Sequence, residues 1–132
     1  MELKEKIKGL RALIVEDNEV TGSFLHRALF IMGFEKTDLA EDEQTALSLL
    51  NQKQYDFVLS DTNYGCSGAR DYYGPRIVVA ARKLGQDPRV IAMSGLDNNV
   101  EVWTGESEAD LFLRKPFSLA DLKEALEKIY WL

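Results

Sequence analysis

The stretch Phe57-Val58-Leu59-Ser60-Asp61 decides the fold, because the rest of the chain repeats its pattern of an apolar run that ends at a polar residue. Apolar runs of four to six residues cover the ranges Leu10–Val15, Tyr55–Ser60, Val90–Met93 and Leu111–Arg114. Polar residues follow these runs: Glu16-Asp17, Asp61, Ser94 and Lys115-Pro116. In an open parallel sheet the carboxyl ends of the strands share the edge where ligands bind. We therefore expect three acids, one hydroxyl and one amine to converge there.

Helical patterns separate these runs. The spacing of apolar residues predicts helices over Val20–Met32, Glu43–Gln52 and Arg76–Leu84, and a final helix marked by Leu119, Leu122, Leu126 and Ile129. In the first helix, the apolar residues at helical spacing are Val20, Phe24, Ala28 and Ile31. Thr37–Ala40 predicts a weak strand. Residues 98–107 predict only a short or mobile helix, because Asn, Gly, Thr and Val are weak helix formers.

Alternation of strands and helices indicates an α/β fold. Right-handed crossovers then give a flavodoxin-like, doubly wound sheet of five parallel strands, with helices on both faces. In the strand order 2-1-3-4-5 the first and third strands are neighbours, so Asp17 and Asp61 are expected to face each other across the switch point.

Length and composition set the limits of the function. The 132 residues suffice for one domain, 1–132, with 45% hydrophobic and 29% charged residues. The net charge is -6, and no dense stripe of Lys and Arg is present, which argues against direct nucleic-acid binding. Met1–Gly9 lacks an apolar core, and no apolar run is long enough to cross a bilayer. We expect a cytoplasmic protein, monomeric or weakly dimeric, without membrane contact.

The three acids indicate a divalent cation, because unpaired carboxylates repel one another and raise each other's pKa values. Mg²⁺ prefers carboxylate oxygens, keeps several waters and accepts phosphate oxygens. Asp17 and Asp61 are the expected direct ligands, and Glu16 is expected to act through water. Asp61 is the candidate nucleophile for phosphoryl transfer. Lys115 and Ser94 would stabilise the charge on the phosphoryl oxygens.

With these residues in view, the whole chain resembles the receiver domains of two-component response regulators. Leu13–Asn18 resembles the acidic pair of the family's first strand, and Phe57–Asp61 resembles the phospho-acceptor strand. Met93-Ser94-Gly95 resembles the family's hydroxyl position. Arg114-Lys115-Pro116-Phe117 resembles its lysine-proline signature, which often has a cis peptide.

The resemblance implies further roles. It makes the backbone carbonyl of Asn63 a metal ligand and Phe112 the aromatic switch residue, which moves inward together with Ser94. It implies a histidine kinase or a histidine phosphotransfer protein as the phosphoryl donor to Asp61. It also implies a downstream effector that binds the face made by the fourth helix, the fifth strand and the fifth helix. Such a domain catalyses only its own phosphorylation and dephosphorylation.

One segment departs from the family pattern. The family usually has a Met-Pro pair after its aspartate and reaches a glycine about eight positions later, whereas Gly74 lies thirteen positions after Asp61. Gly68 is a second candidate for that glycine. We therefore expect an enlarged loop, within residues 63–74, beside the phosphorylation site.

Other functions remain open. A pseudo-receiver that acts without phosphorylation is disfavoured, because no member of the acid, hydroxyl and lysine set is missing. A phosphohydrolase of the haloacid dehalogenase type is disfavoured because Asp61-Thr62-Asn63 lacks the second acid of that family's Asp-x-Asp pattern. A flavodoxin is disfavoured because acids follow the first strand, where a phosphate-binding loop would need glycines and hydroxyls.

Overall fold

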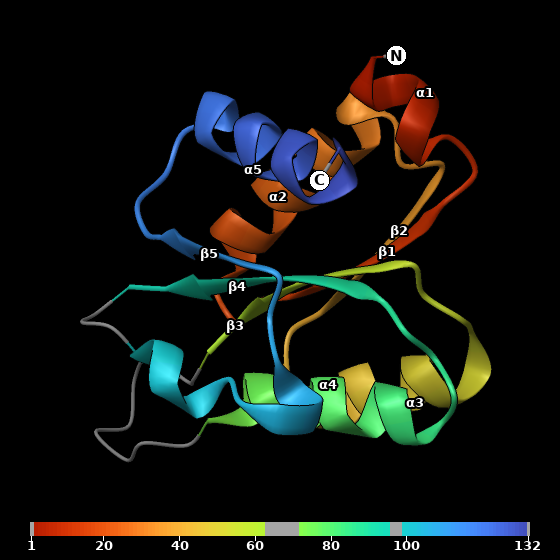
Figure 1. Ribbon diagram of the computed structural model, residues 1–132, viewed down its shortest axis with the longest axis vertical. Helices are drawn as coiled ribbons and strands as arrows, with labels where there is room; N and C mark the ends of the chain where they lie inside the picture. The colour runs from red at the N-terminus through yellow and green to blue at the C-terminus, as the bar shows by residue number, and fades with distance from the viewer. Residues whose placement is uncertain (1, 63–71, 96–98, 132) are drawn as a thin grey trace.

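A computed structural model describes residues 2–62, 72–95 and 99–131. Its centre is a sheet of five parallel strands in the order β2-β1-β3-β4-β5, which confirms the predicted topology (Figure 1). The strands are β1 (Arg11–Val15), β2 (Lys36–Ala40), β3 (Phe57–Asp61), β4 (Arg89–Ser94) and β5 (Leu111–Arg114). Each begins and ends within two residues of its expected range. The apolar runs therefore locate the strands well.

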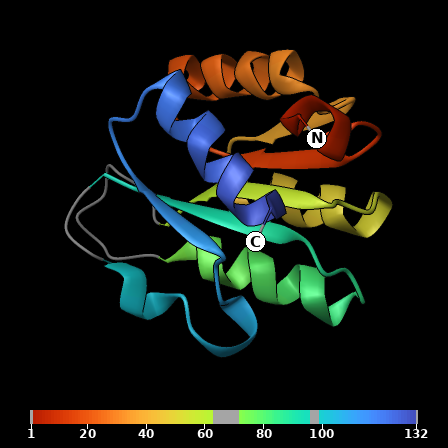
Figure 2. The ribbon, with the colours of Figure 1, turned by 45° about the horizontal axis from the view of Figure 1, so that its top comes forward.

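Helices cover both faces of the sheet, as Figures 1 and 2 show. One layer contains α1 (Leu3–Ile7), α2 (Glu19–Met32) and α5 (Leu119–Trp131). The other contains α3 (Glu43–Gln52), α4 (Tyr73–Lys83) and two 3-10 turns, η1 (Asn99–Val102) and η2 (Gly105–Ser107). In the described ranges, no helix has the length and apolar character needed to cross a membrane.

Each layer packs its own apolar core against the sheet. On the α2 and α5 side the largest buried side chains include Phe34, Phe57 and Leu29, and the two phenyl rings stack with centroids 5.2 Å apart. On the α3 and α4 side the core contains Tyr73 and Trp103. Strand β3 is buried along its whole length, as expected for a strand covered on both faces.

Side-chain caps define the starts of α2, α3 and α5. Asn18 Oδ1 accepts a hydrogen bond from Thr21 N at 2.9 Å, and Asp42 Oδ1 accepts one from Thr45 N at 2.7 Å. Ser118 and Asp121 form a reciprocal capping box at the start of α5: Asp121 N donates to Ser118 Oγ at 3.0 Å, and Ser118 N donates to Asp121 Oδ2 at 2.9 Å.

The buried face of α2 differs from the stripe read from the sequence. Val20, Phe24 and Ile31 are 80%, 47% and 68% exposed, and of the four residues in that stripe only Ala28 is buried. The face that packs on the sheet consists of Gly22, Leu25, Ala28 and Leu29. Helix α2 carries two apolar stripes, and periodicity alone does not tell which one meets the sheet. The other stripe remains exposed.

One additional helix and one helix boundary also differ from expectation. Helix α1 lies within the charged segment Met1–Gly9, where no helix was expected; its Leu3 and Ile7 are buried, and Lys6 Nζ donates to Tyr130 O at 3.0 Å. Helix α4 begins at Tyr73, three residues before the expected start. The last two residues of the expected loop 63–74 therefore belong to a helix.

Candidate functional site

The carboxyl ends of β1 and β3 bring the acids together. The two strands are paired in parallel with Val15 opposite Ser60, so Glu16 and Asp61, the residues that follow, lie side by side. Together with Asp17 they offer carboxylate oxygens that lie within 4.8 Å of one another. Glu16 and Asp61 are buried, whereas Asp17 is half-buried. The predicted convergence of three acids is therefore present.

Lys115 reaches this cluster from the end of β5. Its backbone N donates to Ser94 O at 2.7 Å, which holds the start of the following loop against the end of β4. The Lys115-Pro116 peptide is cis. Lys115 Nζ lies 2.6 Å from Asp61 Oδ1 and also pairs with Glu16 Oε1. One amine thus bridges two of the three acids.

Burial and the surplus of acids shift the pKa values in the cluster. Burial, together with the hydrogen bond to Glu16, raises the pKa of Asp61 to about 8, although the Lys115 charge opposes this rise. Burial also acts against ionisation of Glu16, but hydrogen bonds with Asp61 and Lys115 outweigh it and lower the pKa of Glu16. Burial would lower the pKa of Lys115, yet the neighbouring carboxylates raise it. The ammonium is therefore charged, and a single ammonium does not balance three acids.

This donor set fits Mg²⁺. Carboxylate oxygens are hard ligands, and the three acids are close enough to share one ion. A divalent charge would offset the burial and the contact with Glu16 that raise the pKa of Asp61. Asp17 and Asp61 would hold the ion directly, with Glu16 beside them. Asn63, the fourth expected ligand, lies outside the described residues.

The remaining predicted residues lie near the cluster but on different surfaces. Ser94 ends β4 and is half-buried, and β4 pairs with β3 so that Met93 stands opposite Asp61. Phe112 lies on β5 and is 41% exposed, between the half-buried Leu111 and Leu113. Ser94 is therefore one strand away from Asp61, and Phe112 lies on the outer strand of the sheet.

Three residues of the site were missed by sequence analysis. Tyr73, at the start of α4, donates its hydroxyl hydrogen bond to Asp61 Oδ2 at 3.5 Å. Trp103 Nε1 donates to Thr62 Oγ1 at 3.2 Å, and the Thr62 hydroxyl donates to Met93 O at 2.8 Å. No motif marks these positions; only the adjacency of Thr62 to Asp61 was visible in the sequence.

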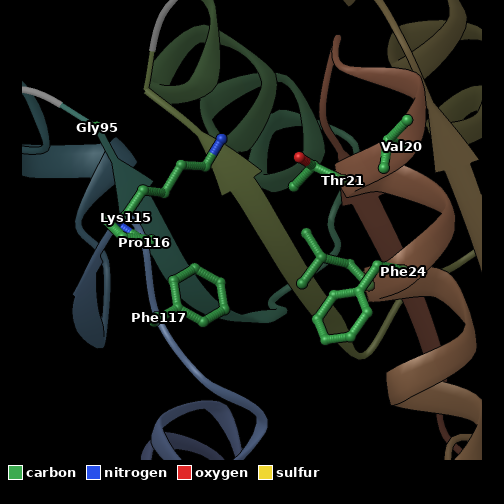
Figure 3. A pocket seen from close by; sticks show the side chains of 8 residues that line it. Val20, Thr21, Phe24, Gly95, Lys115, Pro116 and Phe117 are labelled. Carbon is green, nitrogen blue, oxygen red and sulfur yellow. The ribbon is translucent and has the colours of Figure 1, made fainter.

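An open groove adjoins the acid cluster. It has a volume of about 640 Å³ and runs between α2 and the loop after β5. Figure 3 shows Lys115 and Phe117 on one side, Val20, Thr21 and Phe24 on the other, and the lysine amine pointing between them. Lys115 therefore contacts the carboxylate of Asp61 and also lines the groove.

Comparison with known proteins agrees with this geometry. The family model described as the response regulator receiver domain matches residues 12–127. The chemotaxis protein CheY-3 of Vibrio cholerae serotype O1 is 28% identical over 123 residues, which cover 93% of this chain and 93% of that protein. The transcriptional regulatory protein PcoR of Escherichia coli is 31% identical over 113 residues, which cover 85% of this chain and 47% of that protein.

Solved structures show the same fold. A CheY-like receiver domain from Methylobacillus flagellatus is 27% identical and matches with a TM-score of 0.72, covering 91% of this chain and 98% of its own. The receiver domain of a sensor histidine kinase from Pseudomonas aeruginosa PAO1, which has a magnesium ion coordinated in its active-site cleft, is 22% identical with a TM-score of 0.71. The second match covers 94% of this chain and 99% of its own.

Proposed function

This chain belongs to the response regulator receiver domain family, and from that membership we propose that residues 1–132 form a single receiver domain with Asp61 as its phosphoryl acceptor. Receiver domains of two-component systems are phospho-acceptor signalling modules rather than classical enzymes. The observation that supports Asp61 most strongly is its carboxylate, buried at the end of β3 with Lys115 Nζ 2.6 Å away and two further acids beside it.

In the proposed reaction, a carboxylate oxygen of Asp61 attacks phosphorus, and the bond from phosphorus to the donor breaks with its electron pair on the donor. Negative charge then builds on the peripheral phosphoryl oxygens, so fixed cations and donors carry most of the catalysis. Lys115 would pair with one of these oxygens. The hydroxyl of Ser94, at the end of the neighbouring strand β4, would donate to these oxygens as well. Receiver domains bind Mg²⁺ in the active site. Here the ion would be held by Asp17, Asp61, Glu16 and the Asn63 carbonyl, and its charge would offset the negative charge of the phosphoryl oxygens.

Receiver domains interact with histidine kinases and downstream effectors. We assign the donor's approach to the groove between α2 and Phe117, because Lys115 lines this groove and contacts Asp61. The exposed Val20 and Phe24 give its α2 side an apolar surface. We expect the donor to be a histidine kinase or a histidine phosphotransfer protein. We also expect the domain to act in the cytoplasm as a monomer or weak dimer.

The output surface is the face formed by η1, η2, β5 and α5, which corresponds to the family's fourth helix, fifth strand and fifth helix. Phe112 is exposed on this face, and Ser94 ends β4, the strand between β5 and the strand that carries Asp61. Phosphorylation would shift the population of the two positions of Ser94 and Phe112, and so change the affinity for an effector protein. The net charge of -6 argues against nucleic acid as the direct partner.

Intact-mass spectrometry tests this function. The protein is incubated with acetyl phosphate, with and without Mg²⁺, beside the variants Asp61→Asn and Asp38→Asn, the second being a matched carboxylate on β2. We expect one Mg²⁺-dependent phosphoryl adduct in the wild type and in Asp38→Asn, and none in Asp61→Asn. A folded wild type that binds Mg²⁺ but never carries the adduct would instead indicate a module that acts without phosphorylation.

A further inference from the structure

The two carboxylate oxygens of Asp61 face different donors. Oδ1 lies 2.6 Å from Lys115 Nζ, on the side of the open groove that Lys115 lines. Oδ2 accepts a hydrogen bond of 3.5 Å from the hydroxyl of Tyr73, whose side chain is fully buried in the core beneath the sheet. The acceptor therefore has an open side and a closed side, and a phenol stands on the closed side.

The position of Tyr73 is fixed by its neighbour in the chain. Gly74 N donates to Thr62 O at 3.3 Å, which ties the first turn of α4 to the residue after the acceptor. A Cβ at Gly74 would lie 2.1 Å from Asp61 O and 2.9 Å from the Trp103 ring, so the backbone of α4 touches the end of β3 with no room for a side chain. The close contact of Gly74 with β3 therefore fixes the backbone next to Tyr73, although Tyr73 lies at the end of the segment that departs from the family pattern.

We propose that the Tyr73 hydroxyl is a further functional group of the phosphoryl-transfer site. It binds Oδ2, the oxygen of Asp61 that does not bond to phosphorus, and it shortens the lifetime of the phosphorylated state. This inference rests on the proposed function of Asp61. Because Oδ2 is held against a buried ring, Oδ1 is the oxygen that bonds to phosphorus.

The chemistry gives the direction of the effect. In the acyl phosphate Oδ2 is a carbonyl oxygen with little charge. During hydrolysis the oxygen of water bonds to phosphorus, the Oδ1–P bond breaks with its electron pair on Asp61, and the two protons of the water leave on inorganic phosphate. Negative charge then spreads over both oxygens of the carboxylate, and a donor at Oδ2 stabilises it as it develops. Removal of that donor slows hydrolysis.

A role in packing alone predicts the opposite sign. Tyr73 is fully buried, so loosening the core around it would admit water to the acyl phosphate and speed its loss. The direction of the change in lifetime therefore distinguishes a chemical role of the hydroxyl from a packing role of the ring. Phe at position 73 removes only the hydroxyl, whereas Leu removes the hydroxyl and changes the packing.

The test compares wild type with Tyr73→Phe, Tyr73→Leu and Tyr55→Phe, the last removing a phenol that donates to a different carboxylate, Asp38. Each protein is phosphorylated with acetyl phosphate and Mg²⁺ and desalted, and the decay of the adduct is followed by intact mass, both in Mg²⁺ and in EDTA. Thermal unfolding of each variant is measured in parallel.

We expect Tyr73→Phe to lengthen the lifetime about twofold, the change that corresponds to one weak hydrogen bond. The lengthening should persist in EDTA because the hydroxyl contacts the carboxylate directly, and Tyr55→Phe should decay as the wild type does. An unchanged or shorter lifetime in Tyr73→Phe overturns the inference, as does a lengthening confined to Tyr73→Leu. A wild type that forms no adduct would instead overturn the function assigned to Asp61.

Discussion

Two aspartates of the sheet each accept a hydrogen bond from a tyrosine hydroxyl, yet their surroundings differ. Asp38, on β2, accepts a hydrogen bond of 2.7 Å from the Tyr55 hydroxyl. Two cations also lie near its Oδ2: Lys53 Nζ at 3.3 Å and an Arg11 guanidinium nitrogen at 3.9 Å. Asp61, on β3, accepts a hydrogen bond of 3.5 Å from the Tyr73 hydroxyl, and it shares the Lys115 ammonium with a second buried acid, Glu16. One carboxylate has an excess of positive neighbours, and the other has an excess of negative ones.

The pKa values follow this difference. Burial acts to raise the pKa of Asp38, but the hydrogen bonds from Tyr55 and Lys53 and the nearby cations hold it below its usual value. Burial and Glu16 raise the pKa of Asp61 to about 8. The protein's own cations therefore neutralise Asp38, whereas the acids around Asp61 leave a negative charge that a bound divalent cation would balance.

The largest expected effect on stability comes from Gly74→Ala, which disrupts the contact between α4 and the backbone of Asp61. The added Cβ would lie 2.1 Å from Asp61 O, so α4 must move away from β3. We expect a loss of about 3 kcal/mol in the free energy of unfolding, measured by urea denaturation. Gly95→Ala is the control, because an added Cβ there meets no atom within 4 Å. Equal losses in both variants would contradict the contact.

Amide substitutions should move stability in opposite directions at the two aspartates. Asp38→Asn leaves Lys53 and Arg11 without their carboxylate and should cost about 1–2 kcal/mol. Asp61→Asn removes one of three clustered acids and should stabilise the protein by about 1 kcal/mol when no divalent cation is present. Urea unfolding at pH 7.5 in EDTA measures both. A loss of stability in Asp61→Asn would show that Lys115 already balances the cluster.

Added Mg²⁺ should act only at the Asp61 cluster. At about ten times the dissociation constant, a ligand that binds only the folded state adds about 1.4 kcal/mol to the free energy of unfolding. We expect this gain in the wild type and in Asp38→Asn, and its loss in Asp61→Asn, by thermal unfolding with and without Mg²⁺. Ca²⁺ in place of Mg²⁺ controls for a general effect of divalent charge. A full gain in Asp61→Asn would place the ion elsewhere.

The pH dependence should also differ in sign. The folded pKa of Asp38 lies below its unfolded value of 3.8, so its stabilisation is present above about pH 4 and is lost as the pH falls through the folded pKa. The folded pKa of Asp61 lies above its unfolded value, so without a divalent cation stability decreases as the pH rises from about 4 to about 8. Urea unfolding across this range in EDTA should show the decrease in the wild type and less of it in Asp61→Asn. A profile that Asp61→Asn leaves unchanged would contradict the raised pKa.

The smallest expected effect comes from removing the hydroxyl of Tyr73, for which the hydroxyl of Tyr55 is the comparison. Tyr55→Phe loses a hydrogen bond of 2.7 Å to a charged acceptor and should cost about 1.5 kcal/mol. Tyr73→Phe loses one of 3.5 Å and should cost under about 0.5 kcal/mol. Thermal unfolding of the two variants measures the difference. If Tyr73→Phe is the less stable of the two, the Tyr73 hydroxyl serves the fold rather than the chemistry.

Strand positions and acid positions were visible in the sequence for a simple reason. A strand buried on both faces is a continuous apolar run, and the residue that ends it lies at the edge of the sheet. Asp61 and Lys115 could be placed in one site from this rule alone, although more than fifty residues separate them. Leu122, Leu126 and Ile129 of α5 were likewise identified as part of the buried face of that helix. Leu119, which was expected on the same face, is 47% exposed at the start of the helix.

Other features depended on contacts that no local pattern encodes. The stripe of α2 that meets the sheet is selected by the fit of Gly22 against Leu39, so Val20 and Phe24 remain exposed. Helix α1 is too short for periodicity to reveal, and it is held by packing on α5. The early start of α4 is set by the approach of Gly74 to Asp61 and Trp103.

The sequence by itself determined the parallel sheet, its strand order and the meeting of Glu16, Asp17, Asp61 and Lys115, because strand ends are local signals and the topology of the α/β fold brings them together. Tertiary structure alone decided which oxygen of Asp61 faces Lys115 and which faces Tyr73. The physical reason is that the approach of α4 to β3 is a long-range packing event. Its outcome depends on the absence of a side chain at Gly74 and on the indole of Trp103, and neither of these has a periodic signature.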